Sequence, residues 1–177
     1  DVASKSEEIE FAKNISTDVY NLCMEKINLP GSKSKKYFLI RDNAVSTLAI
    51  FGKNVIKDSL DFDEFLPPFL NALPLLMYFT ENETVMEFFV SAYNKSQDKK
   101  YLELFLRVLV IIFSNLPSAI EKFKLSKELQ SSLLNLLIKL MSQHTDPNDF
   151  VCKVLDGDEN RAEILQQYLK DDEQNEK

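Results

Sequence analysis

The sequence predicts an all-α protein made of repeated helix pairs, and three observations support this fold class. Hydrophobic residues make up 45% of the chain, which excludes wholesale disorder. The chain has only three glycines and no tryptophan, so it lacks much of the turn chemistry of an all-β fold. Apolar residues recur at helical spacing, and the expected helix starts recur at intervals of about 42 residues. From the length of 177 residues we expect one compact unit without a second independent domain.

The first two expected helices are separated by a short basic loop. The first helix covers about Ser4 to Ile27 and stops at the helix breakers Pro30 and Gly31. Residues 32–36 contain three lysines and two serines, which most simply form a solvated connection, with a targeting role as the alternative. The second helix covers about Asp42 to Ile56.

A third helix is predicted by six apolar residues that share one stripe. They are spaced at i, i+3, i+4, i+7, i+8 and i+11 and are Phe62, Phe65, Leu66, Phe69, Leu70 and Leu73. Pro67 and Pro68 remove two backbone donors, so we expect a kink or an irregular first turn. Four acidic residues crowd the start of this helix, namely Asp58, Asp61, Asp63 and Glu64. They are expected to cap free N–H groups, and the alternative is an acidic rim that attracts lysine-rich proteins.

Two further helices follow in the middle of the chain. Thr80 and Glu83 match the S/T-x-x-E capping box, so a helix is expected to start there. The next helix covers Tyr101 to Phe113 and is apolar nearly all round, as expected for a helix with neighbours on both sides. It should be the most buried element.

The carboxyl-terminal part is expected to hold one long helix and two short ones. Ser126 is placed to cap the long helix, which continues to Met141. Short amphipathic segments lie near Phe150–Leu155 and Arg161–Leu169. Residues 170–177 are polar and acidic, and we expect them to be disordered.

The spacing of the helix starts indicates a repeat architecture. Starts near residues 42, 83 and 126 fall within the 40 to 47 residue period of HEAT-type repeats. About three to four repeats would cover residues 1–169, with repeat-like units near 41–77, 81–115 and 126–155. Because such a repeat buries its apolar faces only against its neighbours, we expect an armadillo-like, right-handed α-solenoid of stacked antiparallel helix pairs.

The charge distribution limits the classes of partner. The net charge of −7 is concentrated at the ends, with −3 in residues 1–29, −5 in residues 156–177 and +1 between them. No basic stripe is present, so direct binding to nucleic acid is not expected, whereas basic proteins remain suitable partners.

No catalytic, metal-binding or membrane-spanning motif is recognisable. His144 is the only histidine and is expected in a loop without a nucleophile opposite it, so we expect neither an enzyme nor a cofactor. The longest apolar stretch, Tyr101 to Phe113, is shorter than the ~20 residues that a membrane crossing requires. Cys23 and Cys152 are far apart in apolar surroundings, and we expect both to be buried, reduced thiols. Because the chain starts at Asp1 without a leader, we expect it to be part of a longer protein.

Three segments together resemble the importin-beta (karyopherin-beta) family of nuclear transport receptors. They are Arg41-Asp42-Asn43-Ala44-Val45-Ser46-Thr47-Leu48, Phe65-Leu66-Pro67 and Leu73-Pro74-Leu75. The residues that carry the resemblance most directly are Asp42, Asn43, Ala44, Leu66, Pro67, Leu73 and Pro74. Their order and spacing are similar to a late HEAT repeat, closest to the branch that imports ribosomal proteins and histones. The specific similarity covers about residues 41–93, and helical periodicity alone continues it on both sides.

The resemblance implies a receptor that shuttles between cytoplasm and nucleus. Its concave face would bind protein cargo, its convex face would bind phenylalanine-glycine nucleoporins, and amino-terminal repeats outside this chain would bind Ran-GTP. If second helices line the concave wall, the candidate cargo-binding residues are the polar ones beside the apolar stripes, namely Asp63, Glu64, Asn71, Glu103 and Arg107. The alternative function is a HEAT-repeat scaffold subunit of a complex unrelated to transport, and an all-helical enzyme ranks last.

Overall fold

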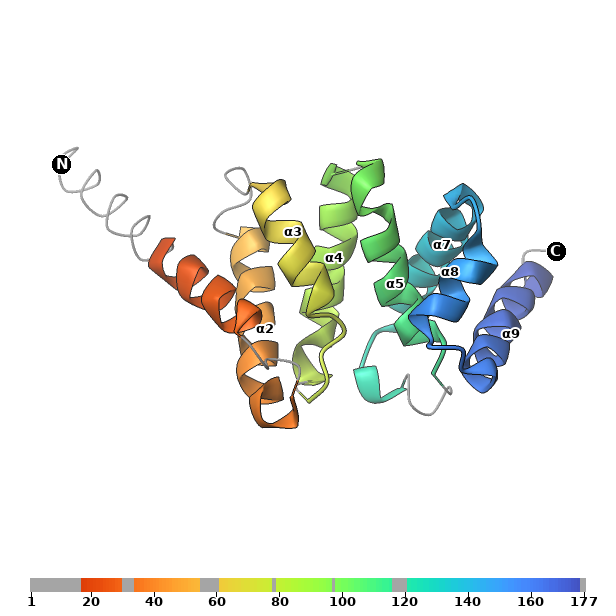
Figure 1. Ribbon diagram of the computed structural model, residues 1–177, viewed down its shortest axis with the longest axis horizontal. Coiled ribbons are helices and arrows are strands. Elements are labelled where there is room, and N and C mark those ends of the chain that lie inside the picture. The colour runs from red at the N-terminus through yellow and green to blue at the C-terminus, as the bar shows by residue number, and fades with distance from the viewer. Residues whose placement is uncertain are drawn as a thin grey trace. The chain divides into compact units, whose positions relative to one another are not determined.

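The computed structural model describes residues 17–29, 34–54, 61–77, 79–96, 98–115 and 121–175. All regular secondary structure in these ranges is helical (Figure 1). The all-α prediction is therefore confirmed for the described residues. The part of the expected first helix before residue 17, as well as Lys33 and Asp58, lies outside them.

The described residues form α-helices and short 3-10 turns, which are labelled η. A helix over residues 17–28 comes first. It is followed by η1 (Lys35–Tyr37), α2 (Phe38–Asn54), α3 (Phe62–Asn71), η2 (Phe79–Glu81), α4 (Asn82–Ser96), η3 (Lys99–Tyr101), α5 (Leu102–Phe113), η4 (Glu121–Phe123), α7 (Lys127–Gln143), α8 (Pro147–Val154) and α9 (Glu159–Asn175).

The chain divides into two compact units, whereas its length predicted one. The first unit ends at Phe89 and the second begins at Val90, so the boundary lies inside α4. Helices that contact mainly their sequence neighbours produce such a division, because few contacts join distant parts of the chain.

Aromatic rings form the core of the first unit. Phe65 and Phe69 of α3 stack with their ring centroids 5.0 Å apart. Phe88 of α4 packs edge-on against both rings, at 5.7 Å from Phe65 and 5.4 Å from Phe69. Gly52 of α2 allows this ring to approach closely, because a Cβ atom at Gly52 would lie only 2.6 Å from Phe88 Cε2. Helices α2, α3 and α4 therefore share one core.

Helix α3 buries four of the six stripe residues that the sequence predicts, and Leu73 is buried beyond the end of the helix. Phe65, Leu66, Phe69 and Leu70 are fully buried. Asp61 is the N-cap, and its carboxylate accepts a hydrogen bond of 2.9 Å from the backbone N–H of Asp63. The capping role expected for Asp61 is thus confirmed, and the helix continues through both prolines to Asn71.

Helix α4 begins later than its capping box predicts. Thr80 lies in the preceding 3-10 turn, and the α-helical residues start at Asn82. Asn82 is only 1% exposed, and its side-chain amide has no hydrogen-bond partner among the described residues. The helix buries an apolar face that includes Val85, Met86 and Phe89.

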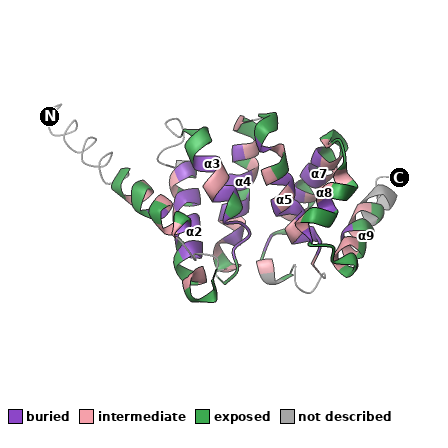
Figure 2. Cartoon of the chain, viewed as in Figure 1, coloured by how far each residue is buried: buried purple, intermediate pink, exposed green. Residues whose placement is uncertain are grey.

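Helix α5 is the centre of the second unit. Seven of its twelve residues are buried, which is the largest share of any described helix, as predicted (Figure 2). It contacts α7, α8 and α9, which explains why its sequence is apolar nearly all round. The predicted cap of α7 is confirmed, because Ser126 Oγ accepts a hydrogen bond of 3.3 Å from the N–H of Leu129.

The carboxyl-terminal helices differ from expectation in two respects. Helix α9 continues to Asn175, although the sequence predicts disorder from residue 170; residues 170–175 contain no glycine or proline that would stop a helix. Cys152 is exposed, so the prediction of a buried thiol is wrong there, whereas Cys23 is buried as expected. In α8 the buried position is Val151, and the next residue turns about 100° away from it.

Candidate functional site

Asp42 joins the first segment of the sequence motif to the turn directly after its last segment, within the first unit. Its carboxylate is fully buried in α2. One oxygen, Oδ2, accepts hydrogen bonds from the backbone N–H groups of Leu76 and Met77, at 2.8 and 2.7 Å. These donors lie 34 and 35 residues further along the chain, in the turn after α3. Asp42 therefore ties α2 to the turn that follows α3.

Arg41 neutralises this buried carboxylate. Its Nη2 atom lies 3.0 Å from the other oxygen of Asp42, and the Arg41 residue is only 5% exposed. The guanidinium carbon also lies 5.1 Å from the ring centroid of Phe38, a cation–π geometry. A buried carboxylate needs such a partner, because desolvation of an isolated charge costs several kcal/mol.

The turn held by Asp42 presents two apolar side chains to solvent. Leu76 is 41% exposed and Met77 is 56% exposed. Leu39, which is 46% exposed, lies one turn before Asp42 on the same side of α2. We call Leu39, Leu76 and Met77 the apolar turn cluster. Because Asp42 holds the backbone of Leu76 and Met77, a partner that binds there has little of the turn to order.

The other residues of the family-like motif serve mainly in packing. Four of them are buried in the first unit, namely Ala44, Leu66, Leu73 and Pro74. Pro67 is half-buried, and Asn43 is exposed. Most of these motif residues therefore contribute to the packing of α2 and α3.

Three predicted cargo residues lie on α3 in the first unit. Asp63 and Glu64 are exposed in its first turn, and Asn71 is exposed at its last residue. The carboxylates of Glu64 and Asp61 lie near Tyr20, where burial, followed by repulsion from these two groups, raises the pKa of the phenol. The start of α3 carries negative charge from three carboxylates, those of Asp61, Asp63 and Glu64.

The other two predicted cargo residues lie four positions apart on α5 in the second unit. Glu103 is 70% exposed, and its carboxylate oxygen lies 3.6 Å from His144 Nε2. Arg107 is half-buried, and burial lowers the pKa of its guanidinium. The same side of α5 continues to Ser114, whose hydroxyl accepts a hydrogen bond of 2.7 Å from Arg161 Nη2. The five candidates therefore divide between the two units, three in the first and two in the second.

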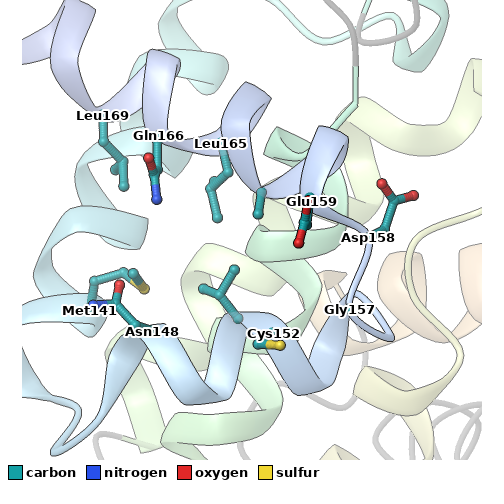
Figure 3. A pocket seen from close by; sticks show the side chains of 11 residues that line it. Met141, Asn148, Cys152, Gly157, Asp158, Glu159, Leu165, Gln166 and Leu169 are labelled. Carbon is teal, nitrogen blue, oxygen red and sulfur yellow. The ribbon is translucent and has the colours of Figure 1, made fainter.

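A groove in the second unit was not predicted. It has a volume of about 210 Å³ and lies between α8 and α9 beside the end of α7 (Figure 3). Its apolar lining consists of Met141, Val151, Ala162, Leu165 and Leu169, and its exposed rim consists of Asn148, Cys152, Gly157, Asp158, Glu159 and Gln166. Leu165, Gln166 and Leu169 point from α9 toward α8.

Sequence reasoning missed this groove because its lining comes from three helices. Each of the short segments near 150–155 and 161–169 is recognisably amphipathic. The distance between their faces, however, depends on the turn at residues 155–158. Gly157, with φ of +74°, and Asp156, with φ of 52°, set that turn. The only sequence signal for this turn is Gly157, because a glycine shortly after a helix is typical of a helix end.

Metal-ligating side chains are not clustered in the part of the chain that the structure describes. The described residues contain no group of three or more histidine, cysteine, aspartate or glutamate residues that could hold a metal ion. His144 lies at the end of α7, where its Nδ1 accepts a hydrogen bond of 3.1 Å from Asp146 N–H and its ring packs 4.9 Å from that of Phe150. Within the same ranges, no helix is long and apolar enough to cross a bilayer.

Comparisons with models of protein families, with curated proteins and with solved structures give no match to this chain.

Proposed function

We propose that the chain forms the carboxyl-terminal HEAT repeats of an importin-beta-type nuclear import receptor. The observation that carries this proposal is the contact of Asp42 with the N–H groups of Leu76 and Met77. It joins the first of the three segments that resemble the family to the turn directly after the third, 34 residues further along the chain. A buried contact between regions so far apart is expected of a real repeat signature and not of a chance similarity.

The spacing of the helices supports the repeat architecture. Helices α2, α4 and α7 begin at residues 38, 82 and 127, which gives intervals of 44 and 45 residues. Helices α3, α5 and α8 begin at residues 62, 102 and 147, at intervals of 40 and 45 residues. Both series fall in the range of HEAT repeats. In the proposed right-handed α-solenoid, α2 and α3, α4 and α5, and α7 and α8 are the successive antiparallel pairs.

The proposed receptor binds proteins and carries out no catalysis. Protein cargo, with basic ribosomal proteins and histones as the first candidates, would bind at Asp63, Glu64 and Asn71 and at Glu103 and Arg107. Nucleoporins would bind apolar surface, for which the apolar turn cluster of Leu39, Leu76 and Met77 is suited by its exposure. Ran-GTP would bind repeats outside residues 1–177, and the receptor would shuttle between cytoplasm and nucleus.

Binding of Ran-GTP and of basic cargo by the full-length protein tests the transport function. We expect the protein to bind a core histone or a basic ribosomal protein and to release it when Ran-GTP is added. Binding of neither ligand would reject the transport function. Cargo binding that Ran-GTP does not affect would favour the alternative of a HEAT scaffold in another complex.

Paired surface variants assign the two proposed sites. Replacement of Asp63 by Asn together with Glu64→Gln should weaken histone binding at low salt and have less effect at high salt, because exposed charges are screened. Replacement of Leu76 and Met77 by Ser should weaken binding of a phenylalanine-glycine nucleoporin fragment and leave histone binding unchanged. The acidic variant and the apolar variant are controls for each other. If both variants weakened histone binding and nucleoporin binding equally, the assignment of two separate sites would be wrong.

A further inference from the structure

We propose that the groove between α8 and α9 binds an amphipathic, basic protein segment that inserts a bulky apolar side chain. The groove is formed within the second unit alone, by the residues of α7, α8 and α9 named above. It does not include any of the five predicted cargo residues. A groove that binds a protein segment is compatible with a transport receptor and with a scaffold. The inference therefore does not depend on the proposed function.

The size and the lining of the groove fit a side chain from a protein partner. A volume of about 210 Å³ is smaller than the roughly 300–1,000 Å³ of pockets that take drug-sized ligands or cofactors. The floor is apolar, because Val151 is 8% and Leu165 is 1% exposed. Met141, Ala162 and Leu169 are half-buried around it. An apolar anchor in a preformed pocket of this kind is the usual centre of a protein interface.

The charge of the rim selects a basic partner. The lining residues include the carboxylates of Asp158 and Glu159 and no lysine or arginine. Asp158 uses one oxygen to accept a hydrogen bond of 3.1 Å from Arg161 N–H. The side chain of Glu159 makes no hydrogen bond or ion pair with any described residue, so it is available to a ligand.

The basic residues closest in sequence to Asp158 and Glu159, namely Lys153 and Arg161, have other side-chain partners. The guanidinium of Arg161 turns to α5, where it donates to Ser114 Oγ. Lys153 pairs with Asp149, and this hydrogen bond, followed by the charge of Asp149, raises the pKa of the Lys153 ammonium. Residues 156–177 together carry a charge of −5. The field at the rim therefore attracts cations.

The same charge argues against other occupants. A second copy of this chain, with its net charge of −7, would bring more negative charge to an acidic rim. Nucleic acid and anionic membrane surfaces would be repelled in the same way. Asn148 and Gln166, which have no side-chain partner among the described residues, face each other across the groove and offer hydrogen bonds to a bound segment (Figure 3).

The test uses three synthetic helical peptides of about 18 residues, or five turns. One peptide has leucines on one face and lysines on the other, the second has glutamates in place of the lysines, and the third has serines in place of the leucines. By fluorescence anisotropy with the chain of 177 residues, the first peptide should bind at least about tenfold more tightly than either of the others. Equal binding of the lysine and glutamate peptides would overturn the proposal.

Matched variants of α9 locate the binding. Glu159→Lys should weaken binding of the leucine–lysine peptide about fivefold. Glu163→Lys makes the same change of net charge on the same helix, but Glu163 does not line the groove, so binding should change less than about twofold. Gln166→Lys provides a second rim variant in case the first one destabilises α9, which circular dichroism would detect. Equal losses in the rim variants and in Glu163→Lys would show that only net charge matters, and would overturn the site.

The reactivity of Cys152 can show whether the groove is occupied, because its thiol is exposed on the rim while Cys23 is buried. A saturating concentration of the leucine–lysine peptide should slow the reaction of Cys152 with Ellman's reagent at least about fivefold, and Cys152→Ser should remove this signal. Unchanged reactivity in the saturated complex would place the peptide elsewhere. Protection that increases with protein concentration without any peptide would assign the groove to a second copy of the chain, and would also overturn the proposal.

Discussion

At the scale of single residues, Asp42 shows how one side chain can fix a turn. It satisfies two backbone N–H groups of the turn after α3 and is itself satisfied by Arg41. The sequence identified Asp42 as part of a family-like motif and predicted a helix start near it. It did not show that α2 begins four residues earlier, at Phe38, or that the carboxylate is buried within the helix.

Replacement of Asp42 by Ala should destabilise the chain by about 3–5 kcal/mol, because it leaves a buried arginine and two backbone donors without their partner. Urea unfolding followed by circular dichroism measures this loss. Asn43→Ala, at the exposed neighbouring position, should change stability by less than about 0.5 kcal/mol. A loss below about 1 kcal/mol for Asp42→Ala would contradict the structural role described here.

The two cysteines should differ strongly in reactivity. Burial raises the pKa of the Cys23 thiol above its ordinary value of 9.0, although a hydrogen bond with Thr47 opposes this shift. At about pH 8 the folded chain should therefore react with Ellman's reagent in one fast phase from Cys152, with Cys23 reacting only on unfolding. Since the pKa of Cys23 is higher in the folded state, its contribution to stability is present below pH 9.0 and is lost as pH rises through the folded-state pKa. Two thiols with equal rates at about pH 8 would show that Cys23 is accessible.

At the scale of helices, local patterns predicted most elements. The stripe of α3, the apolar circumference of α5 and the cap at Ser126 depend on residues within a few turns of each other, and all three are confirmed. The start of α4 and the length of α9 were less accurate, because helix ends respond to weak local preferences. The distance between two packed helices cannot be predicted from the local pattern of either helix.

Gly52 sets the distance between α2 and α4. Gly52→Ala should gain about 1 kcal/mol of helix propensity, but should lose about 1–3 kcal/mol through overpacking against Phe88. The ring cannot easily move away, because Phe65 and Phe69 hold it. A double-mutant cycle with Phe88→Leu, measured by urea unfolding, should show that the two substitutions are coupled, with the loss from Gly52→Ala reduced in the Phe88→Leu background. Additive effects would show that this contact does not set the helix spacing.

At the scale of the whole molecule, the two compact units are connected by a shared helix. Their boundary between Phe89 and Val90 lies near the middle of α4, so each unit depends on half of the same element. We therefore expect the chain to unfold in one cooperative transition. The chain length predicted one compact unit, and the spacing of the helix starts predicted the repeats. Neither property indicates at which residue the chain divides into two units.

Val90→Pro should separate the two units. Proline in the helix interior costs about 3 kcal/mol or more, because it removes a backbone hydrogen bond and clashes with the preceding turn. Urea unfolding should then show two transitions, and hydrogen exchange should assign them to residues before and after position 90. Ser91→Ala, at an exposed position of the same helix, should preserve the single transition. A single transition in Val90→Pro would show that the units do not depend on a continuous α4.

The sequence by itself determined the helical class, most helix positions and the apolar faces, because these follow from hydrogen bonds and spacings within a few residues. It also marked Asp42, Leu73 and Pro74 as parts of one motif. Only the tertiary structure decided that Asp42 binds the N–H groups of Leu76 and Met77, that Gly52 receives the ring of Phe88, and that α8 and α9 leave a groove between them. Each of these features joins residues from different helices, and their distance depends on how the packed side chains fill the space between those helices.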